Sequence, residues 1–257
     1  MKRKFIFFDI DGTLTVKETG KPVESAIEAC RKLEEAGHFV ALCTGRAFYK
    51  SVGFAQKNGF KNMVCNGGHG IYIDGKLVEN GPIDYEKSLA LYREFRKKGY
   101  GVLCAMDDST KVYAEDFSFY DQCGPRREET VYIIDEHFDP ADWDAIYKLY
   151  VSIKPEEEKN IELFDTVGHM RFVPEYVMYQ HDDKKRGIMK VLEMLDGKPE
   201  DVVVFGDDEN DFAMFDEEFF CVAMGNGNEK LKAGADYVCE DNTDDGIYKT
   251  CEKFGWF

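Results

Sequence analysis

The sequence has no long hydrophobic run. A membrane-spanning helix requires about 20 predominantly apolar residues, and no segment of the 257 residues approaches that length. The apolar run near the start, Phe5–Phe8, ends at Asp9 and is too short for the apolar region of a secretory signal peptide. These absences argue against a membrane partner and predict a cytoplasmic protein.

Positive charge is scarce as well. The chain carries 33 Lys and Arg residues against 50 Asp and Glu residues, so its formal net charge is -17. Such an acidic protein repels nucleic acids and anionic membranes, and we expect neither as a partner. A small phosphorylated metabolite remains compatible with this charge where a metal ion or nearby Lys and Arg side chains overcome the overall field.

Cysteine pairs at metal-binding or redox spacing are also missing. The chain has eight cysteines, but no two of them have the spacing CxxC, so a zinc ribbon or a thioredoxin-like site is not supported. Cys43, Cys65 and Cys221 lie within apolar runs, where a reduced cysteine behaves as a small hydrophobic residue.

The first and last thirds of the chain alternate short apolar strands with amphipathic helices, and the length is sufficient for two domains. The strands are near-continuous apolar runs, which are typical of a parallel sheet covered by helices on both faces. We therefore predict an α/β fold with a doubly wound parallel sheet. The predicted strands are 5–8, 39–43, 63–65, 202–205 and 237–239, with a hairpin at 71–78; the predicted helices are about 22–36, 47–58 and 188–195, the last one ended by Gly197.

The middle of the chain has a different pattern. Amphipathic helices are expected near 84–98 and 139–150, and the stretches 111–115 and 169–173 alternate polar and apolar residues. Alternation of this kind indicates an antiparallel sheet with one solvated face. We expect a second, α+β domain at 82–181, inserted into a first domain made of 1–81 and 182–257.

Polar clusters follow three of the buried strands. They comprise Asp9–Thr13, Thr44–Arg46 and Gly206–Asp211. Ligands of open α/β sheets bind at the carboxyl ends of the strands, so these clusters are expected to meet in one crevice. Its carboxylates would repel one another, and a hard divalent cation such as Mg²⁺ is the usual solution. The carboxylates concerned are Asp9, Asp11, Asp207 and Asp211.

These residue types suit phosphoryl transfer. A carboxylate such as Asp9 can attack a phosphoryl group whose charge a metal ion neutralises, and Asp11 can protonate the leaving oxygen. The Thr44 hydroxyl and the Gly45 N–H can hold phosphoryl oxygens, and Lys184 is the expected cation. Each cluster alone is also typical of a turn, a loop or a solvated charge run, so the functional interpretation depends on their combination.

At this point the residues resemble a known family. Four segments are similar to the four motifs of the haloacid dehalogenase-like (HAD) hydrolases, in order: Phe8–Leu14, Leu42–Arg46, Lys184, and Gly206–Asp211 in the GDxxND form. Four further segments are similar to the Cof-type subfamily: Cys65–Gly68, Ala223–Gly227, Lys232–Val238 and Asp245–Ile247. Lys185 follows Lys184 directly, so the position of motif three is open by one residue.

The resemblance implies a Rossmann-like core with a class IIB cap and a Mg²⁺-dependent phosphatase that forms an aspartyl-phosphate. It implies Mg²⁺ bound by Asp9, the Asp11 backbone carbonyl and Asp207, with Asp211 in support. It gives Asp9 as nucleophile and Asp11 as acid and base. The phosphate-binding residues expected at the site are Thr44, Gly45, Arg46, Lys184 and Asn210. Substrates of the family are mostly sugar phosphates, with nucleotides and cofactor phosphates such as pyridoxal phosphate or flavin mononucleotide also known.

Two other functions fit the same residues, namely a phosphotransferase or phosphomutase and a non-catalytic regulator that binds a phosphorylated metabolite. A signalling receiver domain does not fit, because receivers are about half this length and their phosphorylated Asp follows a middle strand. The cap is expected to close over the substrate and to select it. Our candidates for that selection are His169 and Arg171, which lie two residues apart on a predicted strand and would share a face. The sequence predicts no oligomeric state.

Overall fold

The computed structural model describes residues 2–257, which form two compact units. One unit runs to Asn80 and resumes at Asp183, and the other is Gly81–Asp182. Each junction lies one residue from the predicted position. Within the described residues, no helix combines the length and the apolar character that a membrane crossing requires.

The first unit is built on an eight-stranded sheet in the order β14-β13-β12-β1-β2-β3-β4-β5. The strands from β14 to β3 are parallel, and β4 and β5 are antiparallel additions at one edge. The strands are β1 (Phe5–Phe8), β2 (Phe39–Cys43), β3 (Met63–Cys65), β4 (Gly70–Ile73), β5 (Lys76–Asn80), β12 (Val202–Gly206), β13 (Phe220–Ala223) and β14 (Tyr237–Val238).

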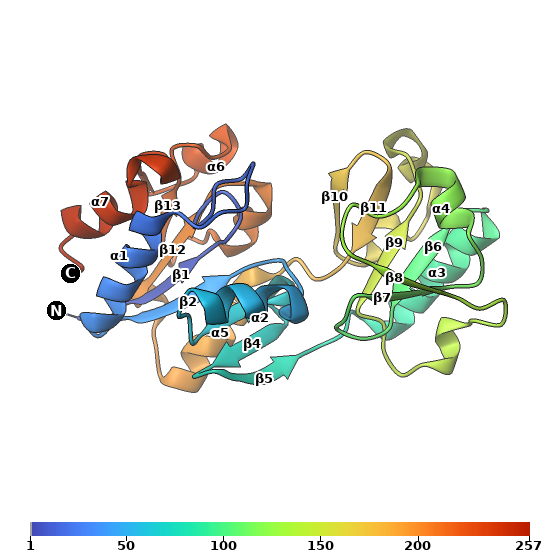
Figure 1. Ribbon diagram of the computed structural model, residues 1–257, viewed down its shortest axis with the longest axis horizontal. Coiled ribbons are helices and arrows are strands. Elements are labelled where there is room, and N and C mark those ends of the chain that lie inside the picture. Colours follow the sequence, from blue (N-terminus) through green and yellow to red (C-terminus); the bar gives the residue numbers. More distant parts are fainter. Residues whose placement is uncertain (1) are drawn as a thin grey trace. The chain divides into compact units, whose positions relative to one another are not determined.

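Helices cover both faces of this sheet, because its central strands are apolar on both sides. Along β1, Ile6 and Phe8 pack into one core and Phe5 and Phe7 into another. The first core contains α1 (Glu24–Glu35), α2 (Phe48–Lys57) and α7 (Gly246–Lys253), and the second contains α5 (Lys184–Leu195). Helices α1 and α7 lie side by side in Figure 1. The α/β fold with a doubly wound, Rossmann-like parallel sheet is confirmed.

Helix α5 ends differently from the prediction. Leu195 is its last residue, and Asp196 takes the left-handed conformation with φ 52°. Gly197, the predicted stop, follows this cap. A Cβ atom at Gly197 would lie 2.7 Å from atoms of both Leu192 and Phe5. The glycine is therefore required there by close packing, whereas Asp196 supplies the turn.

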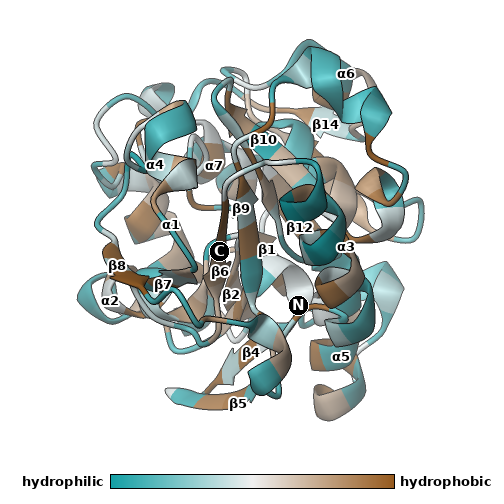
Figure 2. Ribbon diagram, turned by 90° about the vertical axis from the view of Figure 1, so that its right-hand side faces the viewer, coloured by the Kyte–Doolittle hydropathy of each residue, from teal (hydrophilic) through white to brown (hydrophobic). Residues whose placement is uncertain are grey.

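The second unit is an α+β domain with a six-stranded sheet in the order β10-β11-β9-β6-β7-β8. Its pairs are antiparallel except β7 with β8. Helix α3 (Tyr85–Lys97) packs on one face through Leu91, Tyr92 and Phe95. Teal and brown residues alternate along α3 and α5 in Figure 2, as expected for helices with one buried face. The strands of the second unit are β6 (Val102–Ala105), β7 (Lys111–Ala114), β8 (Val131–Ile134), β9 (Lys148–Val151), β10 (His169–Val173) and β11 (Tyr176–Tyr179). Two short helices complete the elements: α4 (Ser118–Cys123) in the second unit and α6 (Glu229–Ala233) in the first.

The helix predicted at 139–150 is wrong. A short 3₁₀ turn, Pro140–Asp142, occupies its first part, and β9 occupies its last part. Strand β9 lies between β11 and β6, where Leu149 and Val151 enter one core and Tyr150 the other. The apolar residues at 143–150 matched helical spacing, but Lys148–Val151 is a central strand that is buried on both faces. Such a short buried strand cannot be told from a buried helical segment by periodicity alone.

Candidate active site

Three carboxylates meet at the carboxyl ends of two neighbouring strands. Asp9 follows β1 and Asp207 follows β12, and these strands pair in parallel with Phe8 opposite Phe205. The Asp9 N–H donates to the Phe205 carbonyl at 2.9 Å. Asp211 lies in the 3₁₀ turn Glu209–Met214 that follows β12. The three side chains are buried, and each offers an oxygen within 4.8 Å of the others.

Lys184 completes this buried cluster. Its Nζ lies 2.8 Å from Asp9 Oδ1 and 2.5 Å from Asp211 Oδ1, and its side chain is only 1% exposed. The next residue, Lys185, is 39% exposed and pairs with Asp216. Of the two lysines that the motif left open, the structure therefore brings Lys184 to the carboxylates.

The Asn66-Gly67-Gly68 turn determines where Lys184 lies. The Asp183 N–H donates to the Gly67 carbonyl at 2.8 Å, so the start of α5 is bound to this turn. Gly68 has a φ of 98°, and a Cβ atom there would lie 1.8 Å from the Asp183 carbonyl oxygen. Only glycine permits this close approach, which explains Gly68 in physical terms.

The cluster carries an excess of negative charge. Burial raises the pKa of Asp9 well above its ordinary value, and the Asp211 charge raises it further. Burial and the same Asp211 charge raise the pKa of Asp207 to about 7. Burial alone would lower the pKa of Lys184, but Asp211 and Asp9 outweigh it and raise that pKa. Since the buried Lys184 does not by itself balance three buried carboxylates, a divalent cation bound by oxygen ligands fits the site.

Asp211 differs from the other two carboxylates in its contacts. Its Oδ2 accepts hydrogen bonds from the N–H groups of Asp207 at 2.8 Å and Asp208 at 3.1 Å, and its Oδ1 accepts from Lys184. A Cβ atom at Gly206 would lie 2.7 Å from this carboxylate. Asp211 is thus engaged in orienting the loop after β12, and Asp9 and Asp207 are better placed to bind a cation.

The turn after Asp9 packs directly on Asp207. Gly12 has a φ of 85°, and a Cβ atom there would lie 2.2 Å from Asp207 Oδ2. Thr13 Oγ1 donates to Asp207 Oδ1 at 3.2 Å. The positive φ of Gly12 favours glycine in this turn, and the contact with Asp207 adds a second reason for glycine.

Asp11 and Arg46 form an ion pair at the exposed side of the site. Arg46 Nε lies 2.8 Å from Asp11 Oδ2, and Arg46 Nη2 bonds the other carboxylate oxygen. The two side chains are 52% and 32% exposed, respectively. Arg46, expected to bind phosphate, therefore contacts the predicted acid and base, Asp11. Thr44 is buried at the end of β2, and its hydroxyl accepts from the Arg46 N–H at 3.1 Å.

The remaining predicted residues lie at different places. Asn210 belongs to the same 3₁₀ turn as Asp211, and Gly45 lies between Thr44 and Arg46. His169 and Arg171 are on β10 of the second unit. The His169 ring packs against Phe164 and Tyr179, and Arg171 bonds Glu158 and the Ile153 carbonyl. Their role in substrate selection stays a prediction.

Sequence reasoning missed three residues of the site. Thr13 lies within the first motif but was given no role. Lys17 Nζ lies 3.6 Å from Asp207 Oδ2 and also bonds Asp208, and Asn242 bonds the turn after Asp9. Lys17 and Asn242 are single polar residues in loops, and nothing in their neighbourhood distinguishes them from solvated positions.

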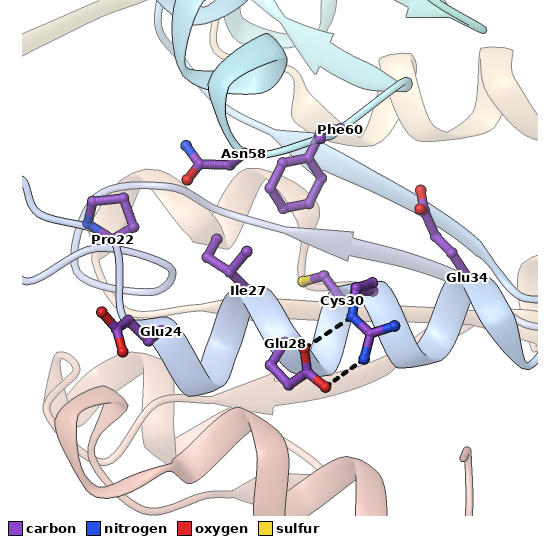
Figure 3. A pocket seen from close by; sticks show the side chains of 10 residues that line it. Pro22, Glu24, Ile27, Glu28, Cys30, Glu34, Asn58 and Phe60 are labelled. Carbon is purple, nitrogen blue, oxygen red and sulfur yellow. Dashed lines mark hydrogen bonds and ion pairs between the residues drawn. The ribbon is translucent and has the colours of Figure 1, made fainter.

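A separate pocket lies between α1 and the 58–60 loop (Figure 3). Glu24, Glu28 and Glu34, which Figure 3 labels, line it, and the lining residue Arg31 bonds Glu28. None of the predicted site residues is among the described residues that line it. Its acidic lining does not suit a phosphate group.

Comparisons with known proteins agree with this geometry. The family model of the haloacid dehalogenase-like hydrolases matches residues 6–250. A phosphoglycolate phosphatase of Methanobrevibacter smithii is 28% identical over 97% of each chain. The pyridoxal phosphate phosphatase YbhA of Escherichia coli is 28% identical over 96% of this chain and 97% of its own.

A solved structure of a HAD subclass IIB sugar phosphatase matches with a TM-score of 0.77 and 26% identity, covering 99% of this chain and 100% of that chain. The agreement extends across both units, since the coverage is nearly complete. The fold, the order of the four motifs and the family match lead to one conclusion: the chain belongs to the haloacid dehalogenase-like hydrolases.

Proposed function

We propose that the chain is a Mg²⁺-dependent phosphatase that hydrolyses small phosphorylated metabolites through an aspartyl-phosphate on Asp9. The observation that carries this proposal is the buried cluster in which Asp9 lies 2.8 Å from Lys184 and shares its surroundings with Asp207 and Asp211. A buried carboxylate kept beside a lysine and two further carboxylates has no evident structural use, whereas a phosphoryl-transfer site needs this arrangement.

Asp9 acts as the nucleophile in the proposed reaction. One of its oxygens bonds to phosphorus while the bond from phosphorus to the leaving oxygen breaks. Lys184 favours the ionised form of Asp9, because its ammonium group is bonded to that carboxylate. Bound by Asp9, Asp207 and the Asp11 carbonyl, Mg²⁺ would supply positive charge to the phosphoryl oxygens.

Asp11 moves the protons in both halves of the reaction. It gives a proton to the leaving oxygen in the first step and takes one from the attacking water in the second, which releases phosphate and restores Asp9. Arg46 bonds both oxygens of Asp11 at the exposed side of the site. Because this ion pair favours the ionised carboxylate, it has to open before Asp11 can carry a proton to the leaving oxygen.

Sugar phosphates are the proposed substrate class, with phosphoglycolate and pyridoxal phosphate as further candidates. The support is the activity for which the relatives described above are named. The residues of the first unit are committed to phosphate and metal, so they do not distinguish among these compounds.

The test is phosphate release from a panel of phosphorylated metabolites, measured with Mg²⁺ and with EDTA. We expect release that requires Mg²⁺ and is absent from Asp9→Asn. Release by a folded Asp9→Asn protein would contradict the covalent mechanism. Absence of release from every compound, combined with phosphoryl transfer to an added sugar, would show a phosphotransferase instead.

A further inference from the structure

Two asparagines from the C-terminal segment converge on the turn that carries the proposed acid. Asn226 Nδ2 donates to the Gly12 carbonyl at 2.8 Å, and Asn242 Nδ2 donates to the same oxygen at 2.9 Å. Asn242 also donates to the Thr15 carbonyl at 2.9 Å. Both lone pairs of the Gly12 oxygen are therefore used by side chains that lie more than 200 positions away in the sequence.

The two asparagines are also joined by a hydrogen bond. Asn226 Oδ1 accepts from the Asn242 backbone N–H at 2.9 Å, so both halves of the Asn226 amide are engaged. An amide is the side chain that offers a donor and an acceptor together on one carbon. Asn242 is only 5% exposed, and a buried carbonyl that loses such donors has no water to replace them.

The same C-terminal segment contacts the other side of the site. The Asn228 N–H donates to the Asp207 carbonyl at 2.7 Å. A Cβ atom at Gly227 would lie 2.7 Å from that carbonyl oxygen. The turn after β13 thus touches Asp207 through its backbone and the Gly12 turn through Asn226.

The Gly12 turn is closed by its own hydrogen bonds but needs these contacts for its position. The N–H groups of Leu14 and Thr15 both donate to the Ile10 carbonyl, at 3.1 and 2.9 Å. These bonds determine the local shape of the turn. They do not determine how closely it approaches Asp207, where the contact at Gly12 leaves no room for a Cβ atom.

We infer that Asn226 and Asn242 are positioning residues, which hold the Asp11–Gly12 turn at the correct distance from Asp207 and so determine the geometry of the metal and phosphoryl site. This inference rests on the proposed function. The asparagines act through the Gly12 carbonyl, to which both side chains donate. Displacement of a catalytic group by about 1 Å can reduce the rate about 100-fold, and loss of residues that orient metal ligands reduces metal affinity or activity about 10- to 100-fold.

The chain offers a matched control in Asn62. Its Nδ2 donates to the Val40 carbonyl at 3.0 Å, and its Oδ1 accepts from the Asp74 N–H at 3.1 Å. It is 8% exposed and directly precedes β3, so it lies at the amino ends of the strands, away from the proposed site. Asn62 thus makes the same kinds of hydrogen bond without any contact with the Gly12 turn.

The experiment compares Asn226→Leu, Asn242→Leu and Asn62→Leu in the full chain. Leucine has nearly the shape of asparagine but no hydrogen-bonding groups. For each variant we would measure the melting temperature in EDTA, the rise in melting temperature on adding Mg²⁺, the Mg²⁺ concentration for half-maximal activity, and kcat on the best substrate of the panel.

We expect all three variants to melt at lower temperature than the wild type. Only Asn226→Leu and Asn242→Leu should also lower kcat and raise the Mg²⁺ requirement, each by about tenfold or more, and lose part of the stabilisation by Mg²⁺. If Asn242→Leu does not fold, Asn226, whose side chain lies at an exposed position, still tests the inference.

Unchanged kcat and Mg²⁺ requirement in Asn226→Leu would overturn the inference, as would equal changes in Asn62→Leu. A wild type that releases no phosphate contradicts the proposed function instead. In that case the rise in melting temperature on adding Mg²⁺, compared between the wild type and the three variants, is the remaining test of the inference. A wild type that Mg²⁺ does not stabilise overturns the inference.

Discussion

Lys184 Nζ lies 2.8 Å from Asp9 Oδ1, although 175 positions separate the two residues. This bond joins the start of α5 to the end of β1 and thus both segments of the first unit. Each partner is almost fully buried, so neither charge would be tolerated without the other.

Lys184→Met should reduce kcat by about 100-fold or more, because the transferring phosphoryl group and Asp9 lose their nearest cation. Steady-state phosphate release measures this effect. Lys185→Met is the matched control, since Lys185 bonds Asp216 outside the cluster, and it should stay within about twofold of the wild type. Similar losses in both variants would contradict the assignment of Lys184.

Asp9→Asn should remove turnover while the protein stays folded. The amide keeps the shape of the carboxylate but lacks its nucleophilic oxygen. Phosphate release and circular dichroism measure the two parts of this prediction. Asp74→Asn, at an exposed turn position, is the control and should keep full activity. More than trace activity in Asp9→Asn would exclude the aspartyl-phosphate.

Gly12→Ala should reduce kcat by about 100-fold or more, because its Cβ atom would displace the Asp207 carboxylate or the turn. Gly20→Ala is the control in the same segment. Both glycines have a positive φ, of 85° and 63°, but nothing lies within 4 Å of a Cβ atom at Gly20.

Both alanine variants should therefore lose about 1 to 2 kcal/mol of stability from the left-handed conformation, and only Gly12→Ala should lose activity. Thermal unfolding and phosphate release distinguish the two effects. An active Gly12→Ala protein would show that the turn does not need its present distance from Asp207.

The metal-free protein should lose stability as the pH rises from about 4 toward 8. The pKa of Asp207 is about 7 in the folded protein against an ordinary value of 3.8. The folded state therefore binds a proton more tightly than the unfolded state, and this stabilisation disappears as the pH passes through the folded pKa. Melting temperatures in EDTA measure it.

Mg²⁺ should oppose the loss of stability at higher pH, because it competes with protons for the same carboxylates. Stabilisation by Mg²⁺ should accordingly be larger at pH 8 than at pH 6. In Asp207→Asn the decline between pH 6 and 8 should be smaller. A wild type whose melting temperature in EDTA does not change over this range would contradict the prediction.

His38 should make the protein less stable below about pH 6.5. Its Nδ1 accepts from the Lys4 N–H at 2.9 Å and its Nε2 lies 2.9 Å from the Trp256 carbonyl oxygen, so the neutral ring is held in one tautomer. Burial lowers the pKa of His38, and the charges of Lys4 and Arg3 lower it further. The stabilisation is complete above the unfolded pKa and is lost as the pH falls toward the folded one.

Melting temperatures between pH 7.5 and 5 measure the effect of His38. The variant His38→Asn removes the titrating group and should show a smaller fall over this range. An equal fall in the variant and the wild type would assign the pH dependence to other groups.

The positions of residues that belong to a recognisable sequence pattern could be predicted, whereas those of single residues that only the tertiary fold brings to the site could not. Strands β1, β2 and β12 were predicted because each is an apolar run that ends at a polar cluster, and the carboxyl ends of parallel strands brought Asp9 and Asp207 together. The segment 139–150 was assigned to a helix because a short strand and an irregular segment together imitate helical spacing. Asn242 and Lys17 reach the site only through the tertiary fold, so no local pattern marks them.

The pairing of Phe5 with Val202 has a consequence for synthesis on the ribosome. Strand β1 emerges early, but its neighbour β12 is translated only after the whole of the second unit. The contiguous segment Gly81–Asp182 is complete in sequence while β1 has only β2 beside it. The other edge of β1 is then unpaired, and an unpaired edge of an apolar strand invites association with other chains. The segment that contains β1 and β2 should therefore depend on chaperones until β12 has been made, although it is the earlier of the two to be translated.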